Sequence, residues 1–158
     1  MSRKIYAFAA ILTLCLGACA PGHNNYSHFF TLPANGWAYS DTLTFLPSMD
    51  DSVATGNVAI AVRHSAVYPY ANLWLEISSD GDPLAGMSQI CDTVNIRLCD
   101  RTGRWLGRGM GVSFQISDTL HRHYTLADSV PLYVRHIMRV DTLYDIEQIG
   151  LIFVPDKR

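Results

Sequence analysis

The sequence is short of several residue types, and each shortage excludes a class of protein. It has four cysteines and no Cys-x-x-Cys, which excludes a zinc ribbon and a thioredoxin-like redox centre. It has no cluster of Lys and Arg, so nucleic acid is not expected as a partner. Its acidic residues are 12 Asp but only two Glu, and no facing carboxylate pair, about 5–10 Å apart as a glycosidase needs, stands out among them.

Motifs that mark catalytic sites are also absent from the sequence. There is no Gly-x-Ser-x-Gly nucleophile elbow, no phosphate-binding loop and no His-Glu-x-x-His zinc motif. His121 and His123 would point to the same side of a strand, but no third or fourth metal ligand is suggested nearby. His64 and His136 stand alone. We therefore expect no catalytic residue, no metal, no cofactor and no enzymatic activity, and histidines that face solvent or make ordinary hydrogen bonds.

The one long apolar run lies at the N-terminus and is typical of a signal peptide. Arg3 and Lys4 precede residues 5–16, which are apolar except for one threonine. This run fits a signal sequence and is shorter than the roughly 20 residues that span a bilayer. It ends in Leu16-Gly17-Ala18-Cys19, which resembles the bacterial lipobox. We predict that residues 1–18 are a lipoprotein signal peptide and that Cys19 is lipidated, with an ordinary signal peptide as the alternative.

The mature chain would be a single domain that follows a short tether. Once Arg3 and Lys4 are removed, 10 of the 12 basic residues remain against 14 acidic ones, a formal charge of −4. Residues 19–36 are rich in Pro, Gly and Asn without periodicity, and we predict that they form the tether. Residues 37–158 would form the folded domain. Its cysteines, Cys91 and Cys99, lie eight residues apart on or beside one predicted strand, so we expect two free thiols.

Period-two alternation of apolar residues runs through the predicted domain and is typical of strands. Helical spacing is nearly absent, and only residues 143–149 fit a single helical turn or a loop. About eight short strands with uneven connections predict an all-β fold, an antiparallel β-sandwich of jelly-roll or immunoglobulin-like type. A lipocalin-like barrel is the alternative. The alternating apolar positions are 58, 60 and 62; 73, 75 and 77; 94, 96 and 98; 112, 114 and 116; 120, 124 and 126; 130, 132 and 134; and 149, 151 and 153.

A glycine-rich segment, residues 103–111, is the most unusual local sequence. It opens a predicted strand and not a helix, which excludes a phosphate-cradling loop. Its structural interpretation is the turn and return strand of a hairpin, with Trp105 covering the edge of the core. Its functional interpretation is that Arg104, Trp105 and Arg108 form an exposed surface for a protein or glycan partner.

A second aromatic feature is Trp74, in the segment Tyr68-Pro69-Tyr70-Ala71-Asn72-Leu73-Trp74. On a strand, Trp74 falls on the opposite face from Leu73 and Leu75. It would belong to a second core layer, to a sugar-stacking platform or to a protein-binding surface.

Six tripeptides have the form Asp-Ser/Thr-Leu/Val and use half of all the aspartates. Chance would give fewer than about one at this composition. They fit a repeated strand entry, in which Asp and Ser or Thr end a turn before an apolar strand residue. They also resemble the O-glycosylation acceptor of exported Bacteroidota proteins, and the two interpretations are compatible. We predict a glycan on at least one of the hydroxyl residues, which are Thr42, Ser52, Thr93, Thr119, Ser129 and Thr142.

Five segments follow one another between about Trp37 and Val154. They are Tyr68-Pro69-Tyr70-Ala71-Asn72-Leu73-Trp74-Leu75, Asp92-Thr93-Val94, residues 103–111, His136-Ile137-Met138-Arg139 and Ile146-Glu147-Gln148-Ile149-Gly150-Leu151. Their order and spacing resemble those of the gliding-motility lipoprotein GldH family. The resemblance implies a non-enzymatic cell-envelope lipoprotein, associated with the gliding machinery and through it with type IX secretion. Its domain would act through protein–protein contacts, and a periplasmic glycan-binding sandwich is the alternative. The family offers only Cys19 as a transferable site.

The residues after Cys19 bear on location. They are Ala20, Pro21, Gly22 and His23, and they lack the acidic run that resembles a surface-export signal in lipoproteins of this bacterial group. We therefore expect a lipid anchor in the outer membrane with the domain facing the periplasm. Expected partners are the membrane, through the lipid, and other envelope proteins of the gliding and secretion apparatus, with a glycan as a further ligand.

Overall fold

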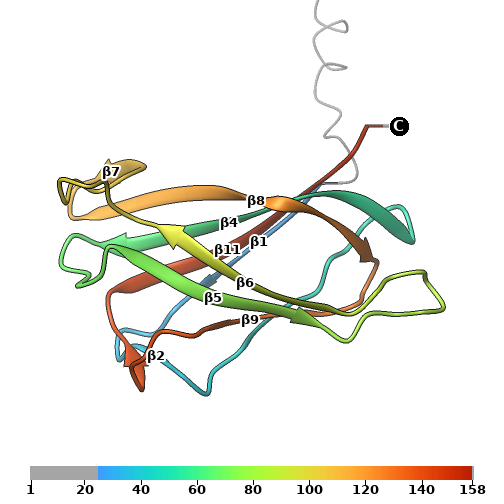
Figure 1. Ribbon diagram of the computed structural model, residues 1–158, viewed down its shortest axis with the longest axis horizontal. Helices are drawn as coiled ribbons and strands as arrows, with labels where there is room; N and C mark the ends of the chain where they lie inside the picture. The colour runs from blue at the N-terminus through green and yellow to red at the C-terminus, as the bar shows by residue number, and fades with distance from the viewer. Residues whose placement is uncertain (1–24, 158) are drawn as a thin grey trace, which may run out of the picture.

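The structure is a computed structural model that describes residues 25–157, which form an antiparallel β-sandwich without a helix (Figure 1). The predicted fold class is confirmed. The predicted signal peptide and Cys19 lie outside the described residues. The strands are β1 (Tyr26–Thr31), β2 (Trp37–Ala38), β3 (Leu43–Phe45), β4 (Val53–Ser65), β5 (Asn72–Ser79), β6 (Ile90–Arg97), β7 (Arg108–Met110), β8 (Ser113–Ala127), β9 (Leu132–His136), β10 (Thr142–Leu143) and β11 (Ile146–Pro155).

Two sheets make the sandwich. One has the strand order β1-β11-β4-β8-β7 and the other has the order β3-β9-β5-β6, while β2 and β10 form a small two-stranded ribbon. The alternating apolar residues predicted for β4, β5 and β11 point into the space between the sheets and are fully buried. Fully burying such a side chain stabilises a fold by about 1.5–3 kcal/mol, so these rows hold the two layers together.

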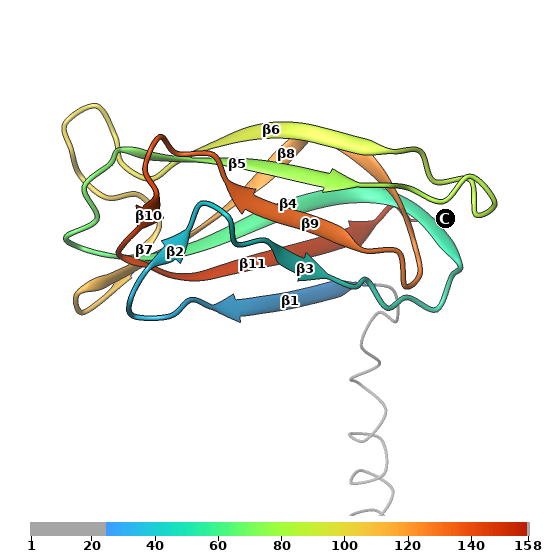
Figure 2. The same cartoon turned by 90° about the horizontal axis from the view of Figure 1, so that it is seen from below.

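Strand β1 corrects the predicted tether. Tyr26–Thr31 pairs with β11 over its whole length, so these residues are an edge strand of the five-stranded sheet (Figure 2). The segment shows no alternation because both of its faces carry rings. Phe30 packs against the core, whereas Phe29 lies over Gly150, where an added Cβ would meet the ring of Phe29. The prediction of a tether over residues 19–36 is therefore wrong for 26–31, and residues 19–24 lie outside the described part.

Two predicted boundaries also change. The alternating runs around 112–116 and 120–126 are a single strand, β8, and an irregularity in its pairing with β4 near Asn57 explains the broken alternation. Val112 sits in the turn before β8 and is exposed. Of the two alternatives for residues 143–149, the helical turn is wrong and the short loop is correct for residues 144–145. β10 ends at Leu143 and β11 begins at Ile146, after Asp145, which has a positive φ of 67°.

The chain crosses between the two main sheets at both open sides of the sandwich. On one side the crossing joins β1 to β3 and passes through β2, and on the other it joins β6 to β7. In the second crossing, residues Cys99 and Trp105 form an isolated antiparallel bridge. The chain then turns at Gly107, where φ is +81° and an added Cβ would meet the backbone oxygen of Gln115. A glycine is therefore required at this position for β7 to reach β8.

Candidate interaction surfaces

Strands β6 and β8, from different sheets, are joined by a polar bridge across one open side of the sandwich. The Nη1 atom of Arg122 on β8 lies 2.9 and 3.1 Å from the two carboxylate oxygens of Asp92 on β6. The Tyr124 hydroxyl donates a hydrogen bond of 2.8 Å to the same carboxylate. Burial, followed by the hydrogen bond to Asp92, raises the pKa of Tyr124. The phenol is therefore held as a hydrogen-bond donor.

Next to this bridge, a groove of about 370 Å³ separates β6 from β8. Its apolar lining comes from the inward-facing residues Val94, Ile96 and Leu120. Val94 remains half-buried, so the inner face of β6 is incompletely covered here. The other lining residues are polar or charged, namely Asp92, Thr93, Asn95, Asp118, Thr119, His121, Arg122 and Tyr124.

The same groove brings together two of the six Asp-Ser/Thr-Leu/Val tripeptides. Thr93 and Thr119 both line it and are both exposed. They lie within strands β6 and β8, so strand entry does not explain these two tripeptides.

The remaining acceptor residues are dispersed over the surface. Thr42 and Ser52 directly precede strands, Thr142 begins β10, and Ser129 lies in the turn after β8. All are exposed except Thr142, which is half-buried. Thr42 also lines a shallow hollow beside Glu76, whose pKa is lowered by its hydrogen bonds with Arg135.

Trp74 lies on the outer face of the four-stranded sheet. Its side chain is 40% exposed, whereas Leu73 and Leu75 are fully buried. The tryptophan borders a hollow of about 570 Å³ that Tyr70 and the segment 137–140 also line. An exposed indole beside a second ring can stack on a sugar or anchor a protein partner.

The three residues predicted around the glycine-rich segment separate in the structure. Trp105 is half-buried and packs edge-on against His64, with ring centroids 4.6 Å apart, so it covers the edge of the core. Arg104 is exposed and pairs with Asp100, whose pKa is lowered to about 2, chiefly by the hydrogen bond from the Thr102 hydroxyl. Arg108 belongs to β7, and Trp105 does not share its surface.

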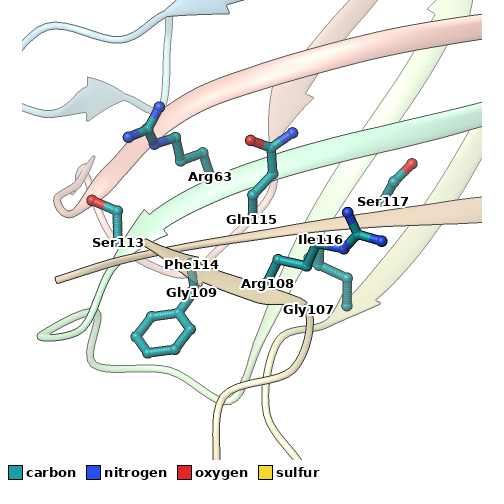
Figure 3. Close-up of a pocket in the computed structure, with 9 residues that line it drawn as sticks. All are labelled: Arg63, Gly107, Arg108, Gly109, Ser113, Phe114, Gln115, Ile116 and Ser117. Carbon is teal, nitrogen blue, oxygen red and sulfur yellow. The ribbon is translucent and has the colours of Figure 1, made fainter. Parts of the chain in front are cut away.

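Arg108 instead lines a hollow of about 700 Å³ at the β7–β8 hairpin. Figure 3 shows Arg63 and Gln115 projecting from one side of their strands and the ring of Phe114 from the other. The Arg63 guanidinium is held by the Glu147 carboxylate at 2.9 Å. Arg108 is exposed and has no ion-pair partner within residues 25–157, so it is the available cation of this hollow.

His64 and His136, which were expected to face solvent or to make ordinary hydrogen bonds, are fully buried and hydrogen-bonded. The Nδ1 atom of His64 lies 2.9 Å from the carbonyl oxygen of Ser65, and Nε2 of His136 lies 3.1 Å from that of Trp37. The other ring nitrogen of each histidine has no hydrogen-bond partner among residues 25–157. Burial lowers the pKa of both, with the hydrogen bonds to backbone carbonyls acting in the opposite direction. Both rings are therefore neutral near pH 7.

The other candidate ligands stay apart. His121 lines the groove, and His123 lies 3.4 Å from the Asp156 carboxylate. No group of three or more His, Cys, Asp or Glu side chains in residues 25–157 is arranged to hold a metal ion.

Cys91 is exposed and Cys99 is buried, and both are free thiols. Residues 25–157 contain no helix that is long and apolar enough to cross a membrane.

The sequence matches one known protein family over most of its length. The model of the GldH lipoprotein family matches residues 24–152, which include the whole sandwich up to the middle of β11. The chain belongs to the GldH lipoprotein family. The resemblance seen in the ordered motifs is thereby confirmed, and membership supports a lipid-anchored protein of the cell envelope. No curated protein matches the chain.

Among solved structures, the GldH-family sandwich is similar to the globular domain of a zebrafish complement 1qA protein. The TM-score is 0.42 at 8% identity, over 85% of this chain and 98% of that one. It is also similar to part of dimeric latent PorU from Porphyromonas gingivalis, with a TM-score of 0.33 at 14% identity, over 89% of this chain and 14% of that one.

No local sequence pattern predicted the polar bridge of Asp92, Arg122 and Tyr124. Asp92 and Arg122 are 30 residues apart, on strands of different sheets. The only available signal was a pair of similar tripeptides, Asp92-Thr93-Val94 and Asp118-Thr119-Leu120, whose meeting depends on how the sheets pack.

Proposed function

We propose that this protein is a non-enzymatic component of the gliding-motility and type IX secretion apparatus, which acts through protein contacts of its sandwich. The family match over residues 24–152 carries the proposal. The exposed Trp74 beside Tyr70 supports it, because a large indole at the surface is characteristic of residues that anchor protein partners.

Cross-linking in cells of the native host followed by affinity purification tests this function. The full-length lipoprotein, with a C-terminal affinity tag, should retain envelope proteins of the gliding or secretion apparatus. The matched sample is an unrelated outer-membrane lipoprotein with the same tag, expressed at the same level. Recovery of the same proteins with both baits, or of none with this one, would contradict the proposal.

The anchor and the modifications belong to the same proposal. We place a lipid on Cys19, the protein in the outer membrane facing the periplasm, and O-linked glycan on at least one of the six tripeptides. The sequence before Cys19 and the exposure of five of the six hydroxyl residues support this. Intact mass of the native protein should exceed that of the polypeptide from residue 19 by lipid plus glycan, and Cys19→Ser should remove the lipid part and release the domain from membranes.

A second candidate function is binding of an envelope glycan, favoured by the hollow that Trp74 and Tyr70 border. Aromatic rings in such a hollow can stack on the apolar face of a sugar. A glycan array probed with the full-length lipoprotein in detergent should then show bound glycans that are lost with Trp74→Ala and retained with Tyr144→Ala, which removes another exposed ring. An array without signal at high protein concentration would exclude this function.

A further inference from the structure

The groove between β6 and β8 marks a place where the sandwich is one strand short. β7 pairs only with Ser113, Phe114 and Gln115, so β8 has no strand partner on that side from Ile116 to Leu126 within the described residues. At the end of β8 the Ala127 N–H donates a hydrogen bond to the Met87 sulfur, which closes the edge there. β6 is the last strand of the opposite sheet. A full-length strand beside β8 would cover the inner face of β6, where Val94 is now only half-buried.

The unpaired edge of β8 can bind backbone. A free strand edge presents a row of N–H and C=O groups to any extended chain that reaches it. Sheet proteins often protect such an edge with Lys, Pro, a β-bulge or an inward-pointing charge. The segment from Ile116 to Ala127 contains neither Lys nor Pro, but it has a pairing irregularity with β4 and the inward-facing carboxylate of Asp118, which disfavours an added strand unless that strand brings a basic side chain. The apolar lining from Val94, Ile96 and Leu120 would accept every second side chain of an added strand.

The charges of the groove select among extended segments. Asp92 is neutralised by Arg122. Asp118 lies on the inward row of β8, is half-buried, and has no ion-pair partner in residues 25–157. The groove therefore has one carboxylate in excess, which a basic side chain on the added strand would neutralise.

We propose that this groove is a strand-addition site, in which an extended segment of an envelope partner pairs with the free edge of β8. The segment has apolar residues at alternate positions and a Lys or Arg that faces Asp118. This proposal specifies how the protein would contact a partner. It rests on the proposed function, because the partner is one of the envelope proteins that the protein would bind.

Site-specific photo-cross-linking in the native host tests the site. p-Benzoylphenylalanine is placed in the full-length lipoprotein at Asn95 or His121, which are exposed and line the groove, and at Val154 or Leu84 as exposed controls elsewhere. The groove positions should yield conjugates with another envelope protein, mapped by mass spectrometry to a segment of alternating apolar residues with a Lys or Arg. The control positions should not yield that conjugate.

Charge reversal provides the second measurement. Asp118→Lys should lower the yield of the conjugate at least tenfold, Asp118→Asn should lower it less, and Asp80→Lys, on an exposed loop, should leave it unchanged. Equal thermal unfolding midpoints of the variants show that the fold is intact.

Several outcomes would overturn the site. They are conjugates with a second copy of this chain, with lipid only, or with equal yield at groove and control positions, and an Asp118→Lys variant that folds and still cross-links fully. If envelope partners are still recovered by affinity purification in these cases, only the strand-addition site fails. If no partner is recovered at all, the proposed function fails as well.

Discussion

The two open sides of the sandwich are closed by different chemistry. Where β1 lies beside β3, the ring of Phe30 packs edge-on against that of Phe45 at 4.9 Å, and Phe45 is fully buried. Where β6 lies across from β8, a carboxylate reaches from Asp92 to Arg122 and Tyr124, and a groove remains beside it. At the aromatic side, between β1 and β3, packed rings cover the core. At the polar side, between β6 and β8, the groove leaves apolar side chains and the edge of β8 accessible.

The crossings at the two sides repeat one motif with different burial. In each, a tryptophan of the crossing segment packs edge-on against a buried histidine. Trp37 meets His136 at 5.1 Å and is buried, whereas Trp105 meets His64 at 4.6 Å and is only half-buried. The crossing beside β1 and β3 is therefore closed more completely than the crossing between β6 and β7.

The largest expected loss of stability comes from a substitution at the aromatic side, between β1 and β3. Phe45→Ala removes a fully buried ring that contacts both Phe30 and His28, and should lower the free energy of unfolding by about 3–5 kcal/mol. Urea denaturation followed by tryptophan fluorescence measures it. Leu46→Ala, at a neighbouring side chain that is 57% exposed, should change stability by less than about 0.5 kcal/mol. Similar losses for both variants would contradict the comparison.

Acidification should lower the stability of the fold through the two buried histidines, His64 and His136. Burial lowers the pKa of His64 and His136, so the unfolded chain binds more protons than the folded one below about pH 6.5. Stability should level off about one pH unit above that value and fall as the pH drops through it, by at most about 2.7 kcal/mol per pH unit for two histidines. Denaturation curves between pH 5.5 and 7.5 measure the slope.

The acidic groups titrate below the pH range in which the two histidines act. Glu76 and Asp100 have lowered pKa values, so the stability they add is lost only at more acidic pH, as each is protonated. Replacing one histidine, as in His64→Gln, should reduce the slope between pH 5.5 and 6.5. A slope that is the same in wild type and in both single histidine variants would show that neither histidine is responsible.

A smaller effect is expected from the hydroxyl of the polar bridge. Tyr124→Phe keeps the buried ring but removes the hydrogen bond to Asp92, and should cost about 0.5–1.5 kcal/mol. Tyr133→Phe is the matched control on β9, since Tyr133 is also largely covered and its hydroxyl makes no hydrogen bond within residues 25–157. Equal denaturation midpoints for wild type and Tyr124→Phe would mean that the bridge does not stabilise the fold.

The smallest effect is expected from the exposed arginine of the bridge. The Arg122 side chain is 63% exposed, so its ion pair with Asp92 should contribute less than about 1 kcal/mol. Arg122→Ala should therefore change stability little, and the difference from wild type should shrink in 1 M salt, where charges are screened within about 3 Å. A loss of stability as large as that of Phe45→Ala would show that the polar bridge stabilises the fold as strongly as the aromatic side does.

Sequence reasoning succeeded where burial is one-sided. The inner rows of β4, β5 and β11 alternate because one face meets the core and the other meets solvent, and Trp74 was placed on the outer face for the same reason. It failed for β1, because Phe29 covers Gly150 on the outer face while Phe30 fills the core on the inner one. A strand with rings on both faces has no period to detect.

The groove and the buried histidines depend on packing between distant segments. Nothing local to His64 predicts that Trp105, 41 positions later, covers it, or that Asp92 meets Tyr124. A sequence can nominate such residues by type, as it did for Trp105, but their partners are fixed by which strands become neighbours and by where β7 stops.

The position of β1 fixes how far the domain can stand from its membrane. With a lipid on Cys19, the folded part begins at Tyr26, seven residues later. Seven residues of fully extended chain span at most about 25 Å, less than the thickness of a bilayer's hydrocarbon core. Tyr26, where the sandwich begins, would therefore lie within about 25 Å of the anchored cysteine, and a partner must reach a domain that is held this close to the lipid headgroups.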